Sequence, residues 1–232
     1  MKVSIIIPSY NELKTLPEIL EKIFALNLEK EVIVVDDGSD DGTSGWLEGM
    51  KNKEIPAAEL KIFRHQKNMG KGAAIITGIK NATGEIIMIQ DADLEYDPRQ
   101  IPGFVDLLTG SDYQAVYGSR LLAGKNRIYN LFYLWGNRFL TFLINFLFGA
   151  GMTDSYTCYK FFKAGVLRDM NLVSDGFEIE AEISAKTALK KLKFAEIPVE
   201  YIPRNRQEGK KIKFKDAVKG IFKIFEIWFK GS

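Results

Sequence analysis

Asp91 and Asp93 are the residues whose type and spacing most clearly suggest chemistry in this sequence. They follow the apolar run 85–89, and two carboxylates two positions apart in an extended chain project to the same side. Such a pair can share one hard cation, Mg²⁺ or Mn²⁺, which also binds phosphate oxygens. Glu95 continues the spacing and is a candidate third ligand. Acidic pairs also occur in solvated loops, so this interpretation depends on the surroundings.

A second acidic segment, 36–43, follows the apolar run 31–35. An acid at the end of a strand can bind ribose hydroxyls or a base N–H, and Asp37 is the candidate for that contact. Part of the segment also matches the ligand spacing of a calcium-binding EF-hand loop, through Asp37, Ser39, Asp41, Gly42 and Glu48. A strand rather than a helix precedes these residues, and Ser44 stands where that loop has an apolar residue, so the calcium site is disfavoured.

Glycines flank Lys71 in the segment 68–72, where a helix is expected to begin. The segment is not a Walker loop, because the distal glycine and the Ser or Thr after the lysine are missing. Glycines at this point could let the N-terminus of the helix approach a phosphate. Lys71 is therefore a candidate for nucleotide-sugar binding.

The composition argues against several other classes of site. The chain has 232 residues, 46% of them hydrophobic and 27% charged, which suits one folded domain with a packed core. A single cysteine, Cys158, and a single histidine, His65, argue against a disulfide framework, a zinc site and a Ser-His-Asp triad. His65 is expected at a strand end. A net charge of +2 gives no reason to expect nucleic-acid binding.

The N-terminal apolar run ends at Pro8 and is too short for a signal peptide, so we expect a cytoplasmic protein. A membrane-spanning helix needs ~20 consecutive apolar residues, and none is present. The segment 128–148 comes nearest, but polar residues interrupt it: Asn130, Asn137, Arg138 and Asn145.

Apolar runs alternate with helical patterns along the chain. Strands are expected at 3–7, 31–35, 60–63, 85–89, 115–117 and 195–202, and helices at 16–26, from 43 onward, at 71–81, 177–192 and 214–229. This alternation predicts an α/β fold with a mostly parallel sheet and helices on both faces. Ligands of such sheets bind beyond the carboxyl ends of the strands.

Those strand ends are unusually polar. The first leads into 8–12, the second into 36–43, the fourth into 90–95, and the fifth into Ser119 and Arg120. Three of these four ends carry acids, which should meet in one cleft. Carboxylates that lie close together repel one another unless a cation is present. The pattern therefore predicts a metal at this edge of the sheet.

The four segments 8–12, 36–43, 68–72 and 90–95 resemble, in their order and spacing, the motifs of family 2 glycosyltransferases with the GT-A fold. Within that family the chain is similar to the dolichyl-phosphate or polyprenyl-phosphate mannosyl- and glucosyltransferases. The segments 118–120, 176–180 and 204–212 support this branch.

The resemblance implies roles for individual residues. On the donor side, the residues implied to bind the nucleotide sugar are Pro8, Tyr10, Glu12, Asp37, Lys71, Asp91, Ala92 and Asp93. The metal would be held by Asp91, Asp93 and Glu95, although the family often has Gln at the last position. The acceptor phosphate would lie near Ser119, Arg120 and Arg127, and Arg204 would reach the diphosphate or the acceptor phosphate. The residues implied to be catalytic are Asp93, Arg120 and Arg204.

The implied reaction is inverting transfer of a hexose, from a donor of the GDP-mannose or UDP-glucose type, to a polyprenyl or dolichyl phosphate. Because a phosphate is already an anion, its attack requires no strong general base. A glycan hydroxyl acceptor would require a carboxylate base, and no clear candidate is present. This second acceptor class stays an alternative, as does a non-catalytic, membrane-associated partner protein.

We expect residues 1–213 to form the GT-A domain, with 1–120 binding the nucleotide sugar and 121–213 on the acceptor side. Residues 214–232 should form a basic amphipathic helix suited to a membrane interface. Its apolar stripe is Phe214, Ala217, Val218, Ile221, Phe222, Phe225, Trp228 and Phe229. The aromatic segment 129–148 is a second interfacial candidate, or else a core or dimer helix. We expect peripheral binding at the cytoplasmic face, directly or through a membrane-protein partner or homo-oligomer.

Overall fold

The computed structural model describes residues 1–231 except 52, 54, 56–57, 125–130 and 205–213. The strands are β1 (Val3–Ser9), β2 (Lys30–Asp36), β3 (Ala58–Arg64), β4 (Ile86–Ile89), β5 (Ala115–Ser119), β6 (Lys160–Lys163) and β7 (Phe194–Pro198). The helices are α1 (Leu16–Phe24), α2 (Thr43–Glu48), α3 (Lys71–Asn81), α4 (Ile101–Thr109), α5 (Leu131–Phe148), α6 (Ala164–Arg168), α7 (Ile179–Leu189) and α8 (Phe214–Gly231). A short 3₁₀ helix, Pro98–Gln100, precedes α4.

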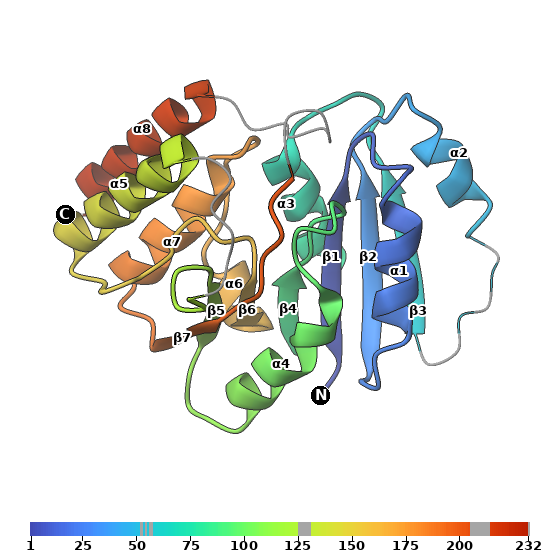
Figure 1. Ribbon diagram of the computed structural model, residues 1–232, viewed down its shortest axis with the longest axis horizontal. Helices are drawn as coiled ribbons and strands as arrows, with labels where there is room; N and C mark the ends of the chain where they lie inside the picture. The colour runs from blue at the N-terminus through green and yellow to red at the C-terminus, as the bar shows by residue number, and fades with distance from the viewer. Residues whose placement is uncertain (52, 54, 56–57, 125–130, 205–213, 232) are drawn as a thin grey trace.

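These strands form a single sheet in the order β3-β2-β1-β4-β6-β5-β7 (Figure 1). All neighbouring pairs are parallel except those of β6, which runs antiparallel to both β4 and β5. The side chains of β2 and β4 are buried along their whole length, as expected for strands covered on both faces. The predicted mostly parallel α/β sheet is confirmed.

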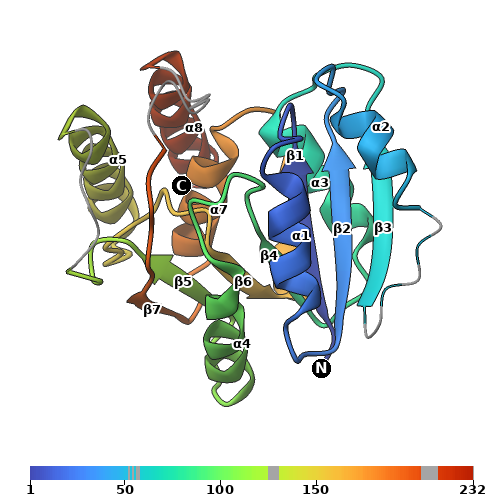
Figure 2. The same cartoon turned by 45° about the vertical axis from the view of Figure 1, so that its right-hand side comes forward.

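Helices cover both faces of the sheet. The helices α1 and α3 lie on opposite faces beside β1 and β2, and both views show this arrangement (Figures 1 and 2). The helix α1 turns Leu16, Ile19, Leu20 and Ile23 into the core, at the i, i+3, i+4, i+7 spacing that makes one apolar face. The first half of the chain is thus a doubly wound layer that fixes the carboxyl ends of β1, β2 and β4.

Three long helices, α5, α7 and α8, pack together beyond the β6-β5-β7 side of the sheet (Figure 2). The middle helix, α7, is buried and rich in small residues. Gly220 of α8 faces it, and a Cβ atom there would overlap the hydroxyl of Tyr156 and contact Ala181. The small residue therefore lets α8 approach α7 closely.

The sequence-based element boundaries hold best where glycine and proline mark them. The helix predicted at 71–81 is α3, and the helix predicted from 214 is α8. His65 directly follows the last residue of β3, as expected. The helices α4 and α6 and the strand β6 were not predicted. Strand β6 has only four residues and carries two lysines, so its sequence gives little of the apolar signal of a buried strand.

Glu31 of β2 is a buried carboxylate that joins three segments of the chain. It accepts hydrogen bonds from the Ser4 hydroxyl, from the hydroxyl and backbone N–H of Thr83, and from the Gly84 N–H, and it pairs with Lys61 at 2.7 Å. Burial alone would raise the pKa of Glu31, but these donors together hold it well below its usual range. The ionised carboxylate thereby stabilises the joined segments.

We expect Glu31→Gln to lower the free energy of unfolding by about 3 kcal/mol, because one partner of a buried ion pair is removed. Since the pKa of Glu31 is depressed in the folded state, its contribution is complete above the unfolded-state pKa of about 4.3 and is lost as the pH falls below that value. Denaturant titrations between pH 7 and pH 3 measure both effects. The control is Glu18→Gln, which removes only a surface pair with Lys22. Equal losses for the two variants would contradict this role for Glu31.

Candidate active site

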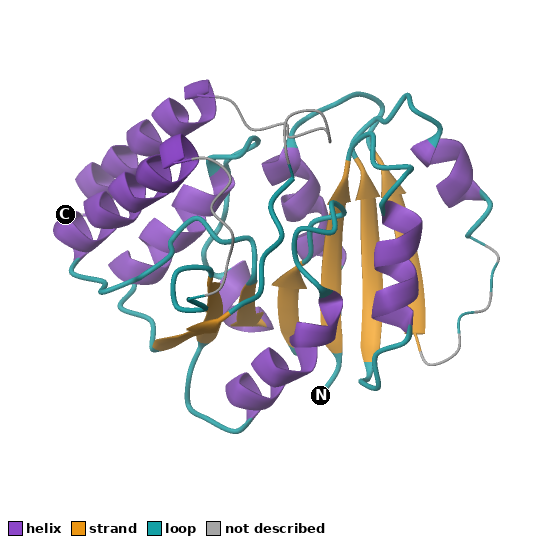
Figure 3. Cartoon of the chain, in the orientation of Figure 1, coloured by secondary structure: helices purple, strands orange, loops and turns teal. Residues whose placement is uncertain are grey.

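The loops after β1, β2 and β4 gather at the carboxyl ends of these strands (Figure 3). Residues of these loops line a cavity of about 640 Å³. Of the residues proposed from the sequence, those that line it are Pro8, Tyr10, Glu12, Asp37, Lys71, Asp91, Ala92, Asp93, Glu95, Arg120 and Arg204. The structure therefore brings together segments from the whole length of the chain. Ser119 is not among the lining residues, and Arg127 lies outside the described residues.

Asp91, at the start of the loop after β4, forms an ion pair with Lys71. The Lys71 Nζ is 2.8 Å from Asp91 Oδ1 and 3.0 Å from Oδ2. Burial acts to raise the pKa of Asp91, but the neighbouring ammonium outweighs it and the pKa is lowered. Asp91 is therefore held as a carboxylate at the wall of the cavity.

Asp93 lies opposite Arg204, whose guanidinium is 3.2 Å from Asp93 Oδ2. The same guanidinium forms two hydrogen bonds of 3.1 Å with the carboxylate of Glu12. Burial, together with the charges of Asp91 and Glu95, raises the pKa of Asp93 to about 7. The cavity thus contains more negative charge around Asp93 than Arg204 alone compensates.

Glu95 is held by contacts within the protein. Its carboxylate accepts hydrogen bonds from the Tyr201 hydroxyl at 2.8 Å and from the Arg204 backbone N–H at 2.7 Å. Within the described ranges, no group of three His, Cys, Asp or Glu side chains is close enough to hold a metal ion. The carboxylate thereby fixes the segment 201–204, and its role as a metal ligand stays a prediction.

Asp37 anchors the loop that leads into α3. Its carboxylate accepts hydrogen bonds from the Met69 and Gly70 N–H groups at 2.9 and 2.8 Å, and it lies 2.7 Å from His65 Nδ1. The buried acid therefore orders the segment that presents Lys71. A contact of Asp37 with ribose or base stays a prediction.

The glycines beside Lys71 serve close packing against the protein itself. A Cβ atom at Gly72 would overlap the carbonyl oxygen of Ser174, and one at Gly70, where φ is +103°, would overlap that of Asp175. The Asp175 carbonyl also accepts a hydrogen bond of 3.0 Å from the Ala73 N–H. These contacts hold the start of α3 against the segment before α7. Gly70 and Lys71 also line the cavity, and the approach of a phosphate to this helix end stays a prediction.

Arg120 lines the cavity from the end of β5, but a buried partner holds its guanidinium. Asp154 accepts hydrogen bonds from Arg120 Nε at 2.7 Å and Nη2 at 2.8 Å, and another from Asn137 at 2.8 Å. The Arg120 guanidinium also lies 5.2 Å from the centre of the Tyr201 ring. Ser119 is fully buried, with its hydroxyl 2.6 Å from that of Thr153, so contact with an acceptor would require the residues that cover it to move.

Sequence reasoning missed several residues of the cavity: Asn137, Leu140, Tyr156, Cys158, Phe177, Glu180 and Tyr201. Most come from α5, α7 and the segments between the later strands, where no motif marks them. Glu180 had a usable signal, because its segment 176–180 supported the family resemblance. Nothing in the sequence showed that its carboxylate would reach Lys71, which lies 3.1 Å away.

The order of these segments along the chain is matched by a known family. A model described as "Glycosyl transferase family 2" matches residues 4–170. The chain belongs to glycosyl transferase family 2. This confirms the family resemblance drawn from the four motifs.

Two relatives from bacteria carry names that state their acceptor. An undecaprenyl-phosphate mannosyltransferase from Micrococcus luteus is 28% identical over 220 residues, which cover 90% of this chain and 87% of that protein. An undecaprenyl-phosphate 4-deoxy-4-formamido-L-arabinose transferase from Sodalis glossinidius is 34% identical over 161 residues, covering 68% of this chain and 47% of that protein. The chain thus matches about half the length of this second relative.

Solved structures show the same fold. Glucosyl-3-phosphoglycerate synthase from Mycobacterium tuberculosis superposes with a TM-score of 0.72 at 17% identity, over 98% of this chain and 80% of that one. Residues 1–349 of S. aureus TarS, in complex with UDP-GlcNAc, superpose with a TM-score of 0.66 at 18% identity. The match covers 98% of this chain and 66% of that one. The predicted GT-A fold is confirmed.

The packing of α3 predicts that Gly72→Ala is destabilising. We expect a loss of about 2 kcal/mol in the free energy of unfolding, because the added methyl meets a backbone carbonyl that cannot move freely. The matched control is Gly103→Ala in α4, where a Cβ atom meets nothing within 4 Å. That helix substitution should gain roughly 0.5–1 kcal/mol. Urea denaturation measures both, and a neutral Gly72→Ala would contradict the close contact with Ser174.

Proposed function

We propose that this chain transfers a hexose from a nucleotide sugar to a polyprenyl phosphate, with inversion at the anomeric carbon. The observation that carries the proposal is the cavity itself, where Asp93 faces the guanidinium of Arg204 and Asp91 faces the ammonium of Lys71. Family membership supports the transferase activity, and the names of the two relatives support the polyprenyl-phosphate acceptor.

On the donor side, Pro8, Tyr10 and Glu12 line one wall of the cavity and Asp91 and Asp93 line another. We propose that the nucleotide lies along the loops after β1 and β2, with its diphosphate toward Asp93 and Arg204. Arg204 is already a bidentate partner of a carboxylate, and a guanidinium binds phosphate oxygens in the same geometry. Residues 1–120 would thereby supply the donor half of the site.

The carboxylate oxygens of the cavity suit the binding of a divalent cation. Among the residues that line the cavity and are described, seven carboxylates face four cationic side chains. The carboxylates are Glu12, Asp37, Asp91, Asp93, Glu95, Glu180 and Asp216, and the cations are Lys71, Arg120, Arg204 and Lys215. Asp91 and Asp93 would hold Mg²⁺ or Mn²⁺ through hard oxygen ligands. A bound metal would supply electrophilic stabilisation of the departing nucleoside diphosphate.

On the acceptor side, Arg120 and Tyr201 line the cavity together with residues of α5 and α8. An acceptor phosphate placed here would bring an oxygen that is already anionic to the anomeric carbon, so no proton has to be removed. The carboxylates nearby are paired: Glu12 with Arg204, Glu95 with Tyr201, and Glu180 with lysines. A glycan hydroxyl would need a carboxylate base, and none of these three residues is free to act as one.

We propose that the protein reaches its lipid acceptor by binding peripherally to the membrane through α5 and α8. In the described part of the chain, no helix is both long and apolar enough to cross a bilayer. The helix α5 turns polar side chains inward, where Asn137, Thr141 and Asn145 each form hydrogen bonds with the segment 152–155. Its outer face carries aromatic residues that are 52% to 73% exposed: Trp135, Phe139, Phe142 and Phe146.

The helix α8 continues this surface only in part. Ile224 and Ile227 are buried against the protein, while Phe222 and Phe229 are exposed. Lysines 215, 219 and 230 lie beside them on the exposed side of the helix. Exposed aromatic rings and lysines suit an interface with anionic lipids. Of the predicted apolar stripe, Ala217, Ile221 and Phe225 are partly buried against the core, whereas Phe222 and Phe229 are available to a membrane. The buried Ile224 and Ile227 lie outside that stripe.

Purified protein should release nucleoside diphosphate when it is given polyprenyl phosphate, Mn²⁺ and the correct donor from a panel of UDP- and GDP-sugars. We expect Asp93→Asn to lower kcat/KM by about 10²- to 10³-fold, because a charge that stabilises the leaving group through the metal is lost. Asp106→Asn, on α4 outside the cavity, is the control. Release with a glycan acceptor alone would favour the hydroxyl alternative, and no release with any donor would favour a non-catalytic partner.

The membrane surface makes a separate prediction. Phe142→Ser combined with Phe222→Ser should weaken binding to vesicles that contain anionic lipid by about tenfold, since two exposed rings no longer enter the interface. Flotation of the protein with vesicles measures this binding. Val173→Ser removes an exposed apolar residue outside α5 and α8 and should have no effect. Equal flotation of all three proteins would refute the role of these helices.

A further inference from the structure

Behind Asp91, a chain of alternating charges runs into the interior of the protein. Lys71 Nζ lies between Asp91, at 2.8 Å, and Glu180 Oε1, at 3.1 Å. The other oxygen of Glu180 accepts a hydrogen bond from Lys160, whose side chain is completely buried. The four groups come from four elements or their ends: the loop after β4, α3, α7 and β6.

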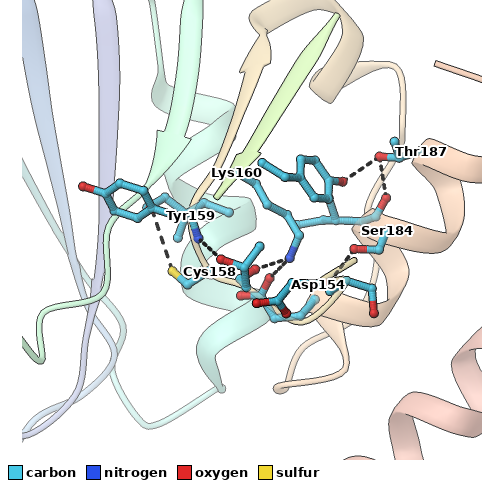
Figure 4. Close-up of polar contacts among 12 residues, drawn as sticks. Asp154, Cys158, Tyr159, Lys160, Ser184 and Thr187 are labelled. Atoms are coloured by element: carbon cyan, nitrogen blue, oxygen red, sulfur yellow. Dashed lines mark hydrogen bonds and ion pairs between the residues drawn. The ribbon is translucent and has the colours of Figure 1, made fainter. Parts of the chain in front are cut away.

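The inner end of this chain is firmly held. The Lys160 ammonium also donates to the Thr157 carbonyl and lies 5.4 Å from the centre of the Tyr117 ring. Figure 4 shows Lys160 with its nitrogen directed at acceptor oxygens between the strands and the helix. Glu180 is buried in α7, a helix packed on both sides. Burying two ions is costly unless each is paired, so this arrangement needs a function or a compensation.

Lys71 is the member of this chain that contacts Asp91 at the cavity wall. Its ammonium is the partner of Asp91, the first carboxylate of the candidate metal site, and it therefore competes with a divalent cation for that carboxylate. Glu180 attracts the same ammonium from the opposite side, which weakens the hold of Lys71 on Asp91. The strength of one buried pair thus sets how readily the carboxylate can accept a metal.

We propose that Glu180 is a positioning residue that acts through Lys71: by sharing the Lys71 ammonium, it leaves Asp91 available to the metal. This inference rests on the proposed function, in which Asp91 holds a divalent cation. The role of Lys160 is to hold the Glu180 carboxylate in place. Glu180 itself forms no bond in the transfer reaction.

A double-mutant cycle on metal binding tests this role. The dissociation constant for Mn²⁺ alone is measured by the electron paramagnetic resonance signal of free Mn²⁺, without nucleotide or lipid. We expect Glu180→Gln to weaken binding by about tenfold, because Lys71 then pairs with Asp91 alone, and Lys71→Gln to strengthen it. In the Lys71→Gln background, Glu180→Gln should change the constant by less than about twofold.

The double variant separates the proposal from two simpler effects. If Glu180 acted only through its general electric field, Glu180→Gln would weaken metal binding equally in the wild-type and Lys71→Gln backgrounds. That result would overturn a role through Lys71. A merely structural role would weaken binding in both single variants, which would also overturn it. Glu180→Asp keeps the charge and should recover most of the lost affinity. Lys71→Met replaces the lysine in the cycle if Lys71→Gln does not fold.

This cycle is independent of catalysis. Absence of Mn²⁺ binding in all variants would overturn the inference, whereas the transfer assay decides the proposed function separately. If the protein is active and the effects of Glu180→Gln and Lys71→Gln on the free energy of Mn²⁺ binding are additive, the proposed transferase function is kept and the positioning role of Glu180 is rejected.

Discussion

The compensation of buried negative charge at the carboxyl edge of the sheet is the constraint on which the rest of this structure depends. Parallel strands bring the acids that follow β1, β2 and β4 to one place, and the same geometry that makes a binding site there makes the site repulsive. Lys71 and Arg204 supply the opposing charges. Both are held by further contacts, Lys71 by Glu180 and Arg204 by the anchoring of its backbone N–H on Glu95. The site is therefore compact before any ligand binds.

The need to compensate these negative charges explains why the site requires the second half of the chain, although its four sequence motifs lie in the first half. Arg204 pairs with Glu12 across 192 positions of sequence, and Glu180 of α7 reaches Lys71 of α3. The hydrogen bonds of Asp154 with Arg120 and Asn137 fix α5 to the end of β5 in a similar way. Helices α5 and α8, which carry the exposed aromatic rings, thus form walls of the same cavity that contains the acids.

Sequence alone predicted the sheet, the edge where the site lies and eleven of the residues that line the cavity, because strand-end acids and glycine-marked helix starts are local signals. The sequence did not predict which side chains contact one another. That Asp37 orders the loop before α3, that Glu95 is used by Tyr201, and that Ser119 is buried all follow from tertiary contacts. Strand β6 escaped notice for the same reason, since its buried Lys160 is tolerable only beside Glu180. The division into donor and acceptor halves stays a proposal.

The central claim is that a nucleotide sugar binds with its diphosphate between Asp91, Asp93 and Arg204. A crystal structure of the protein with Mn²⁺ and the nucleoside diphosphate selected by a donor screen tests it most directly. We expect the metal on Asp91 and Asp93, and the Arg204 guanidinium moved from Glu12 to the diphosphate. A nucleotide bound outside this cavity, or one bound inside it with Arg204 still on Glu12 and no metal on the two aspartates, would contradict the account.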